Sequence, residues 1–406
     1  MLLEERYVTY KVKEFENLRN PYYRVQANIN LDAICNNINE IRQVIKPGTK
    51  IMAVIKADGY GHGARHIASA LSEIGVEAFA IATIEEGIDL RNRGIDSTLL
   101  ILGYTPKEQY ADLVKYGISQ TVYEYNMAEE ISKQAVLLGK NSKIHIKVET
   151  GMNRIGFSDT QESIESILRI SKLPNIEIEG IFTHFASADE ADKTFAHVQL
   201  ERYSNFVNKL EKAGLSIPMK HISNSAGIID LPEANYDMVR SGIITYGLYP
   251  STQVRSDRLK LTPAMELKSH VVYVKEVGPN QGISYGSTFI TEKVTRVATV
   301  SIGYGDGYPR ALSNKGRVLI HGEYANILGR VCMDQFMVDV SHIDNVQRGD
   351  VVTLVGKDGS NRITVEEIAD YAGSFNYEFI CGIGKRIPRV YYQKGKIKEC
   401  SAFYQY

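Results

Sequence analysis

The segment AVIKADGYGHG, residues 53–63, places one lysine, Lys56, at the end of an apolar run and directly before a glycine-rich turn. A lysine there lies at the carboxyl-terminal end of a buried strand, and the glycines after it let the backbone and a phosphate group approach closely. A lone lysine after a buried strand is often a structural or ion-paired residue. The whole segment, rather than the lysine alone, therefore predicts a chemical role.

Other polar residues follow apolar runs in the same way. They are Lys147 and Arg154 in KVETGMNR, His184 in THF, Asn224 and Ser225 in NS, and Arg240, Gly242 and Ile243 in RSGI. If the apolar runs are parallel strands closed into a barrel, these residues gather at the carboxyl ends of the strands, where barrel enzymes have their active sites. The last two groups follow the expected seventh and eighth strands, whose loops usually bind phosphate. Their position predicts a phosphate-containing cofactor.

The elements that must position these residues are short apolar runs alternating with amphipathic helical patterns, which is typical of βα units and a parallel sheet. The expected strands are 50–56, 78–83, 98–103, 119–123, 143–149, 178–185, 219–223 and 238–240, and the expected helices include 66–74, 83–93, 126–138, 161–173 and 196–213. The fold class that accommodates this α/β pattern is an eight-stranded parallel (β/α)8 barrel resembling a TIM barrel.

Beyond residue 261 the pattern changes to valine-rich strands separated by glycine turns. Strands are expected there at 269–275, 296–301, 317–320, 335–340 and 350–354. We therefore expect an N-terminal extension of unknown role at 1–20, a cofactor-binding barrel at 21–262 and a mainly β C-terminal domain at 263–406.

Composition narrows the class of protein. The 406 residues include 47 lysines and arginines against 48 aspartates and glutamates, which leaves no excess charge to bind nucleic acid or an acidic membrane surface. No apolar segment reaches the length of a membrane span, so we expect a cytoplasmic protein. The four scattered cysteines predict reduced thiols. His62 and His66 have the spacing of a metal pair, but no third ligand is evident and we expect no metal site.

A series of motifs between about residues 25 and 392 resembles the alanine racemase family of fold-type III pyridoxal-phosphate enzymes. The motifs are AVIKADGYGHG at 53–63, KVETGMNRIG at 147–156, THF at 183–185, NS at 224–225, RSGI at 240–243, SYG at 284–286, GYGDG at 303–307 and GRVCMDQ at 329–335. The resemblance implies a pyridoxal 5'-phosphate-dependent enzyme that interconverts L- and D-alanine and supplies D-alanine for cell-wall peptidoglycan.

A racemase needs two bases, because a proton removed from one face of the α-carbon must be returned to the other. The resemblance implies that Lys56 holds the cofactor covalently and is one base, and that Tyr285 is the second. Free tyrosine, with a pKa of about 10, is a poor base, so cations must stabilise its phenolate. His184 and Arg240 are the candidates. Arg240 also matches the donor to the pyridine nitrogen, which keeps that nitrogen unprotonated and disfavours transamination.

The remaining roles come from the same match. The residues that match phosphate or ring contacts are Tyr60, Asn224, Ser225, Gly242 and Ile243. Arg154 matches a group near the substrate carboxylate. Lys147 occupies a position that is carboxylated in many members, and without carboxylation it would be a like charge beside Arg154.

The C-terminal domain supplies its own set of matched residues. Met333 matches a contact to the substrate carboxylate, Asp334 a hydrogen-bond partner near the catalytic tyrosine, and Tyr304 an aromatic residue at the entrance. In the family this domain reaches the barrel of the other subunit. The resemblance therefore implies a homodimer with shared active sites that act on a small amino acid.

One position departs from the family pattern. Members usually have a tyrosine in SYRVPR, next to the phosphate and the substrate side chain, whereas residues 384–389 read GKRIPR, with Lys385 in its place. A cation can still meet the phosphate, but the aromatic wall that limits side-chain size is lost. A serine racemase or one of broad specificity is therefore an open alternative.

Two other classes share the barrel. A non-catalytic pyridoxal-phosphate carrier generally lacks the β domain, and Tyr285, Met333 and Asp334 count against it. A fold-type III decarboxylase usually has an acidic partner at the pyridine nitrogen, which Arg240 is not.

Overall fold

The computed structural model describes residues 24–402, which form two compact units. The barrel unit consists of Ala33–Gly59 and Ala64–Thr262, and the β unit consists of residues 24–32, Tyr60–Gly63 and residues 263–402. The extension expected at 1–20 lies outside the described residues. Among residues 24–402, no helix combines the length and the apolar character needed to cross a membrane.

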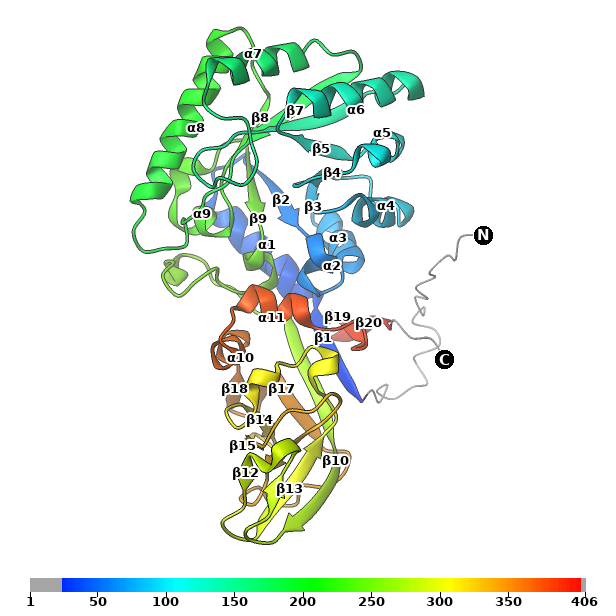
Figure 1. Ribbon diagram of the computed structural model, residues 1–406, viewed down its shortest axis with the longest axis vertical. Helices are drawn as coiled ribbons and strands as arrows, with labels where there is room; N and C mark the ends of the chain where they lie inside the picture. The colour runs from blue at the N-terminus through cyan, green and yellow to red at the C-terminus, as the bar shows by residue number, and fades with distance from the viewer. Residues whose placement is uncertain (1–23, 403–406) are drawn as a thin grey trace. The chain divides into compact units, whose positions relative to one another are not determined.

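The barrel unit is built on parallel strands that close on themselves in chain order (Figure 1). These strands are β2 (Lys50–Val54), β3 (Ala78–Ile81), β4 (Thr98–Ile101), β5 (Ser119–Val122), β6 (Ser142–Lys147), β7 (Ile176–Phe182), β8 (Met219–His221) and β9 (Met238–Ser241). The ring closes where β2 pairs with β9, with Met52 opposite Arg240. The prediction of an eight-stranded parallel barrel is confirmed. Several strands end two to three residues before their expected ends, because the terminal polar residues belong to the loops.

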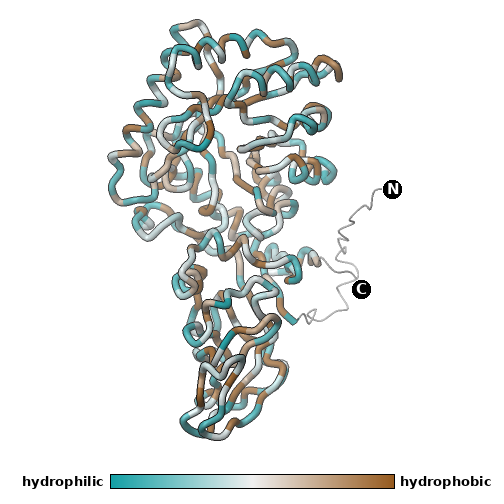
Figure 2. The backbone as a smooth tube through the Cα atoms, viewed as in Figure 1, coloured by the Kyte–Doolittle hydropathy of each residue, from teal (hydrophilic) through white to brown (hydrophobic). Residues whose placement is uncertain are grey.

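Helices lie along the outside of the barrel strands (Figure 1). They are α1 (Leu31–Val44), α2 (Lys56–Tyr60), α3 (Ala64–Glu73), α4 (Ile84–Asn92), α5 (Tyr110–Tyr116), α6 (Tyr125–Leu138), α7 (Gln161–Ile170), α8 (Thr194–Lys212) and α9 (Ser225–Asp230), with 3₁₀ turns η2 (Lys107–Gln109), η3 (Pro232–Ala234), η4 (Ile243–Tyr246) and η5 (Ser256–Arg258). In α8 the buried residues recur at helical spacing, for example Ala196, Gln199, Tyr203 and Val207. Figure 2 shows hydrophilic and hydrophobic residues interspersed along the helices of the barrel unit.

The β unit contains a ten-stranded sheet in the order β18-β17-β14-β15-β16-β13-β10-β1-β19-β20. Its strands are β1 (Val25–Asn30), β10 (Met265–Val277), β13 (Thr295–Val300), β14 (Arg317–Ile320), β15 (Glu323–Leu328), β16 (Phe336–Asp339), β17 (Val351–Asp358), β18 (Asn361–Ile363), β19 (Arg389–Gln393) and β20 (Lys396–Ser401). A separate pair, β11 (Gly282–Ile283) and β12 (Phe289–Ile290), flanks the 3₁₀ turn η6 (Tyr285–Ser287). Further turns are η7 (Tyr304–Asp306) and η8 (Arg310–Leu312), and the helices are α10 (Val365–Ala372) and α11 (Asn376–Gly382).

The β unit differs from expectation at β1. The barrel was expected to begin at residue 21, but Val25–Asn30 pairs antiparallel with β10 and parallel with β19. Its residues alternate between buried and half-buried up to Ile29, which is the pattern of a half-buried strand. The described part of the chain therefore begins in the β unit, forms the barrel unit and returns to the β unit.

Candidate active site

Lys56 lies two residues after the end of β2 and opens a left-handed turn. Ala57, Asp58, Gly59 and Tyr60 all have positive φ, at 52°, 52°, 62° and 51°. A left-handed backbone costs roughly 1–2 kcal/mol for each residue that is not glycine. Such strain persists only where the surrounding structure imposes it, and it is concentrated at functional sites.

Glu86, in the first turn of α4, fixes this turn through hydrogen bonds. Its carboxylate accepts hydrogen bonds from the backbone N–H of Ala57 (2.7 Å) and of Ala82 (2.8 Å), which ties the ends of β2 and β3 together. At the far side of the turn, Asp58 Oδ1 accepts a hydrogen bond from Ala64 N (2.9 Å). The half-buried Lys56 is thus held on a fixed backbone.

Arg240 lies on β9, next to β2, and is only 2% exposed. Its Nη2 donates to Thr183 O (2.8 Å), Ile222 O (3.0 Å) and His184 Nδ1 (3.0 Å), and its Nη1 donates to His221 Nδ1 (2.8 Å). Burial lowers the pKa of Arg240 to about 10, which keeps the guanidinium charged at neutral pH. All four of these hydrogen bonds use the two Nη atoms of Arg240, and none uses its Nε.

Burial and the charge of Arg240 together determine the protonation state of His184. Burial, followed by the neighbouring Arg240, holds the pKa of His184 well below its usual value, so the imidazole is neutral at neutral pH. Because an arginine can only donate, His184 Nδ1 must accept and the ring proton is on Nε2.

Lys147, at the end of β6, is 3% exposed, and its Nζ donates to Val148 O (2.8 Å). Burial lowers its pKa to about 7; Glu149 opposes this shift, and Arg240 and Arg154 add to it. At neutral pH much of the Lys147 amine is therefore uncharged. Arg154 itself is exposed, and its backbone N–H donates to Glu149 (3.3 Å).

The loops after β8 and β9 are joined by one hydrogen bond, from Gly242 N to Ser225 Oγ (3.1 Å). Asn224 caps α9 by accepting from Gly227 N (3.0 Å). Ile243 opens η4 directly after Gly242. A hydroxyl and backbone amides thus gather where the two loops meet, as a phosphate site requires.

In the β unit, Tyr285 lies on η6 and is 70% exposed. The preceding Ser284 has a φ of 66°, and its hydroxyl donates to Arg330 O (2.6 Å). Gly329 allows this approach, because a Cβ there would lie 2.5 Å from Ile283 O. The turn that carries Tyr285 is therefore fixed against the loop that leads to Met333.

Tyr304 and Met333 are held together through the backbone. Tyr304 N donates to Cys332 O (3.0 Å), and Gly305 N donates to Met333 O (2.8 Å). Both side chains are substantially exposed, at 43% for Tyr304 and 52% for Met333. The structure thus brings Tyr285, Tyr304, Met333 and Asp334 into one surface region of the β unit.

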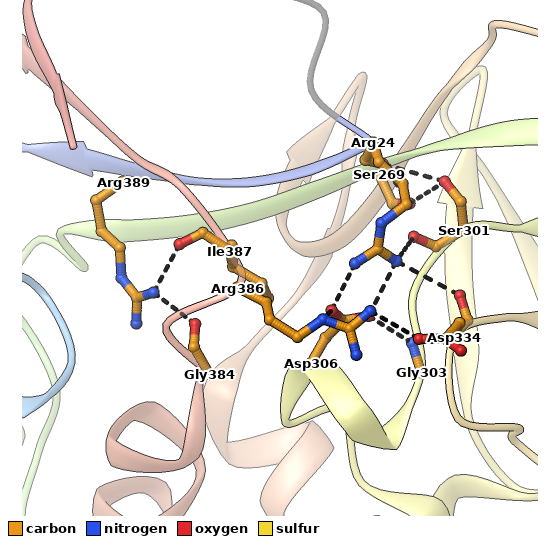
Figure 3. Close-up of polar contacts among 10 residues, drawn as sticks. All are labelled: Arg24, Ser269, Ser301, Gly303, Asp306, Asp334, Gly384, Arg386, Ile387 and Arg389. Carbon is orange, nitrogen blue, oxygen red and sulfur yellow. Dashed lines mark hydrogen bonds and ion pairs between the residues drawn. The ribbon is translucent and has the colours of Figure 1, made fainter. Parts of the chain in front are cut away.

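A fully buried carboxylate, Asp306, organises this region (Figure 3). Arg24 makes a two-pronged contact with it (3.0 and 2.5 Å), and Gly303 N donates to it (3.1 Å). Arg386 reaches both Asp306 (3.5 Å) and Asp334 (2.7 Å). The position of Asp334 is therefore tied to the core of the β unit.

Lys385 is exposed, in a turn that Arg389 holds in place (Figure 3). Arg389 donates to Gly384 O (2.6 Å), Ile387 O (2.7 Å) and, through Nε, to Gly61 O (3.0 Å). The segment Tyr60–Gly63 thus belongs to the β unit and is bonded to the turn that carries Lys385.

The glycines of this segment have a different role from the one we expected. A Cβ at Gly61 would lie 2.2 Å from Ile380 O, and one at Gly63 would lie 1.9 Å from the Tyr391 hydroxyl. These glycines therefore permit close packing inside the β unit. Tyr60 is buried, with its ring 6.1 Å from that of Tyr377, and burial raises its pKa.

Sequence reasoning did not identify several residues that hold these groups. They are Glu86, His145, Glu179, His221, Arg24, Asp306 and Arg389. Among the described residues, no cluster of three or more histidine, cysteine, aspartate or glutamate side chains could hold a metal ion.

Comparison with known proteins shows which family has this sequence and fold. Residues 29–250 match the family model described as alanine racemase, N-terminal domain, and residues 264–391 match the alanine racemase, C-terminal domain. The chain belongs to the alanine racemase family. The predicted resemblance to this family is therefore confirmed. Members of the family depend on pyridoxal phosphate.

Individual alanine racemases are similar over nearly their whole length. That of Methanococcus maripaludis is 48% identical over 367 residues, which cover 90% of this chain and 98% of the relative. That of Clostridium perfringens strain SM101 is 48% identical over 92% of this chain and 96% of the relative.

Solved alanine racemase structures share the fold. The enzyme of Clostridium difficile 630 superposes with a TM-score of 0.92 at 42% identity, covering 95% of this chain and 100% of that chain. The Bacillus anthracis enzyme with bound L-Ala-P superposes with a TM-score of 0.88 at 34% identity, covering 94% of this chain and 98% of that chain. The match over both domains favours an alanine racemase over the serine or broad-specificity alternative.

Proposed function

We propose that this protein is a pyridoxal 5'-phosphate-dependent alanine racemase that uses Lys56 and Tyr285 as its two bases. One observation supports this most strongly. Lys56 follows β2, and the buried Arg240 lies on the neighbouring strand β9. The two strands pair with Met52 opposite Arg240. An amine and a charged donor thus lie at the same end of the barrel, where barrel enzymes have their active sites.

The residues present fit the cofactor. Lys56 offers a primary amine, and Ser225 and Ile243 offer donors to a phosphate beside Gly242, whose N–H donates to Ser225 Oγ. Arg240 has both Nη groups engaged, which leaves the Nε–H as the donor for a ring nitrogen. When bound, pyridoxal phosphate supplies an electron sink that makes the α-hydrogen of the amino acid acidic.

The two bases act on opposite faces of the substrate. In one direction Lys56 Nζ removes the α-proton and Tyr285 Oη delivers a proton to the other face; in the reverse direction the roles exchange. His184, held neutral by burial and by Arg240, offers an Nε2–H donor at the carboxyl end of the barrel. We propose that it supports the Tyr285 phenolate. Arg154 and Met333 bind or position the substrate carboxylate, and Asp334 is a hydrogen-bond partner near Tyr285.

Carboxylation of Lys147 is part of the proposal. A neutral amine attacks carbon dioxide, an N–C bond forms and one proton leaves, which gives a carbamate anion. With a pKa of about 7, Lys147 presents the neutral amine at physiological pH. The carbamate would place a negative charge near Arg154 and Arg240, where the amine is largely uncharged.

We further propose a homodimer in which the β unit of one subunit completes the barrel of the other. Tyr285, Tyr304 and Met333 are 70%, 43% and 52% exposed. Clustered exposed aromatic and apolar side chains are typical of interaction sites. In this arrangement the barrel of one subunit holds the cofactor and the first base, Lys56, and the C-terminal domain of the other subunit carries the second base, Tyr285. The role in D-alanine supply for peptidoglycan and the cytoplasmic location stay predictions.

The test is chiral chromatography of cofactor-loaded enzyme incubated separately with L-alanine and L-serine. We expect rapid formation of D-alanine and little D-serine. Comparable or faster D-serine formation would make Lys385 the leading specificity determinant. Formation of neither product, or release of carbon dioxide, would contradict the proposed function.

A further inference from the structure

A chain of buried polar side chains leads from Arg240 toward the amino-terminal end of the barrel. Arg240 Nη1 contacts His221 Nδ1 (2.8 Å), His221 Nε2 contacts His145 Nδ1 (2.9 Å), and His145 Nε2 contacts Glu179 Oε2 (3.3 Å). His221 is 0% exposed and His145 is 1% exposed. None of these groups except Arg240 has a part in the mechanism proposed above.

The direction of every proton in this chain follows from its first member. An arginine cannot accept, so His221 Nδ1 carries a lone pair and its proton is on Nε2. That N–H must donate to His145 Nδ1, which leaves the proton of His145 on Nε2, pointing at Glu179.

Other protonation states fail in this arrangement. A proton on His145 Nδ1 would set two N–H groups against each other across 2.9 Å. If His145 were doubly protonated, both nitrogens of His221 would have to accept, which makes His221 an imidazolate. The chain therefore needs an acceptor after His145, and Glu179 is that acceptor.

Packing holds the members of the chain in place. The His221 ring stacks on Phe182 at a centroid distance of 4.7 Å. A Cβ at Gly180 would lie 2.3 Å from His145 Nδ1, so only glycine leaves room for this ring. Glu179, 17% exposed, also accepts from Lys143 Nζ (2.9 Å) and Ser119 Oγ (3.2 Å). Burial raises the pKa of Glu179, but the hydrogen bonds from His145 and Lys143 outweigh it and lower the pKa to about 2.

We propose that Glu179 is a positioning residue that acts through His145 and His221 to hold Arg240 in a single orientation. The chain keeps Nη1 of Arg240 engaged on its inner side, so that its Nε–H stays available to the cofactor ring. The role toward the cofactor rests on the proposed function, whereas the tautomers of His145 and His221 do not.

The experiment is ¹⁵N NMR of histidine-labelled holoenzyme and apoprotein, with the nine histidines assigned by single substitutions. In the wild type we expect Nδ1 unprotonated and Nε2 protonated in both His145 and His221. Glu179→Leu removes the acceptor, and we expect it to abolish the hydrogen-bonded Nε2–H signal of His145 and to lower kcat/KM by on the order of tenfold. Glu179→Gln keeps an acceptor oxygen, so the tautomers should persist and the loss of activity should be smaller.

Glu177→Leu is the matched control, because Glu177 lies on the same strand and its side chain is 53% exposed. We expect it to change neither the ring signals nor kcat/KM. The proposal is overturned if wild-type His221 or His145 carries its proton on Nδ1, or if Glu179→Leu leaves both signals and kcat/KM unchanged. If Glu179→Leu fails to fold, the proposal is tested by the tautomers of His145 and His221 in the wild type and in Glu179→Gln, where a proton on Nδ1 of either ring would overturn it. Wild-type enzyme that fails to racemise alanine while the tautomers are as stated would refute the proposed function alone.

Discussion

Arg240 Nη2 lies 3.0 Å from His184 Nδ1, so a donor that is always charged faces a ring nitrogen that must accept. This contact fixes the tautomer of His184 and, with burial, keeps the ring neutral. It also joins the carboxyl ends of β7 and β9, which are not neighbours in the barrel.

Neutral buried histidines predict a stability that falls in acid. Burial and Arg240 lower the pKa of His184 and His221 well below the unfolded value of about 6.5. Below that pH the unfolded chain binds more protons than the folded one, so the free energy of unfolding falls by about 1.4 kcal/mol per pH unit for each histidine. Urea denaturation of apoprotein between pH 7.5 and about 5.5 should show this slope. His184→Asn should reduce the slope by about one proton; a slope equal to that of the wild type would contradict the assignment.

The low pKa of Lys147 predicts carbamate formation that rises with pH. The neutral fraction of an amine with a pKa of about 7 increases as the pH rises through 7. We expect a carbamate signal in ¹³C NMR of enzyme in labelled bicarbonate that is stronger at pH 8 than at about pH 6 and absent in Lys147→Ala. Lys143→Arg is the control, since its contact with Glu179 raises the pKa of Lys143 and keeps that amine charged. A signal that survives in Lys147→Ala would place the modification elsewhere.

The buried Asp306 predicts that the substrate loop depends on one carboxylate. Asp306→Asn leaves Arg24 without its ionic partner and Arg386 with Asp334 alone. Breaking a buried pair costs about 3–5 kcal/mol, and partial exposure of the arginines puts the effect toward or below the lower end. We expect a lower urea midpoint and, because Arg386 also contacts Asp334, a raised KM for alanine. The exposed Asp344→Asn should leave both unchanged. An unaltered KM in Asp306→Asn would contradict the role of Asp306 in positioning the loop that carries Asp334.

The close approach at Gly61 predicts a position at which even alanine is poorly tolerated. Its Cβ would lie 2.2 Å from a backbone carbonyl, at a φ of 76°. Gly139 has a φ of 61° with nothing within 4 Å of the added atom, so Gly139→Ala measures the backbone cost alone, about 1–2 kcal/mol. Gly61→Ala should lower the free energy of unfolding by clearly more than Gly139→Ala. Equal losses would show that the segment has room to move.

The sequence predicts the barrel well because each strand is a short apolar run followed by a polar or glycine-rich turn. β1 was not predicted as part of the β sheet, since its partners β10 and β19 are more than 230 residues away and local pattern does not reveal them. Site residues could be found where they follow a strand or lie near its carboxyl end, as Lys56 and Arg240 do. Glu86 was hidden because a glutamate three residues after Thr83 at a helix start suggests ordinary capping. His145 and His221 lie inside strands, where a histidine gives no local sign of its partners.

The central claim, that Lys56 and Tyr285 act on opposite faces of the α-carbon, is tested most directly with Tyr285→Phe in D₂O. Proton NMR would follow loss of the α-proton from L-alanine and from D-alanine in separate reactions. We expect that the variant still exchanges the α-proton of one enantiomer, exchanges the other far more slowly and forms almost no product of opposite configuration. Racemisation at the wild-type rate, or equal loss of exchange from both enantiomers, would contradict it.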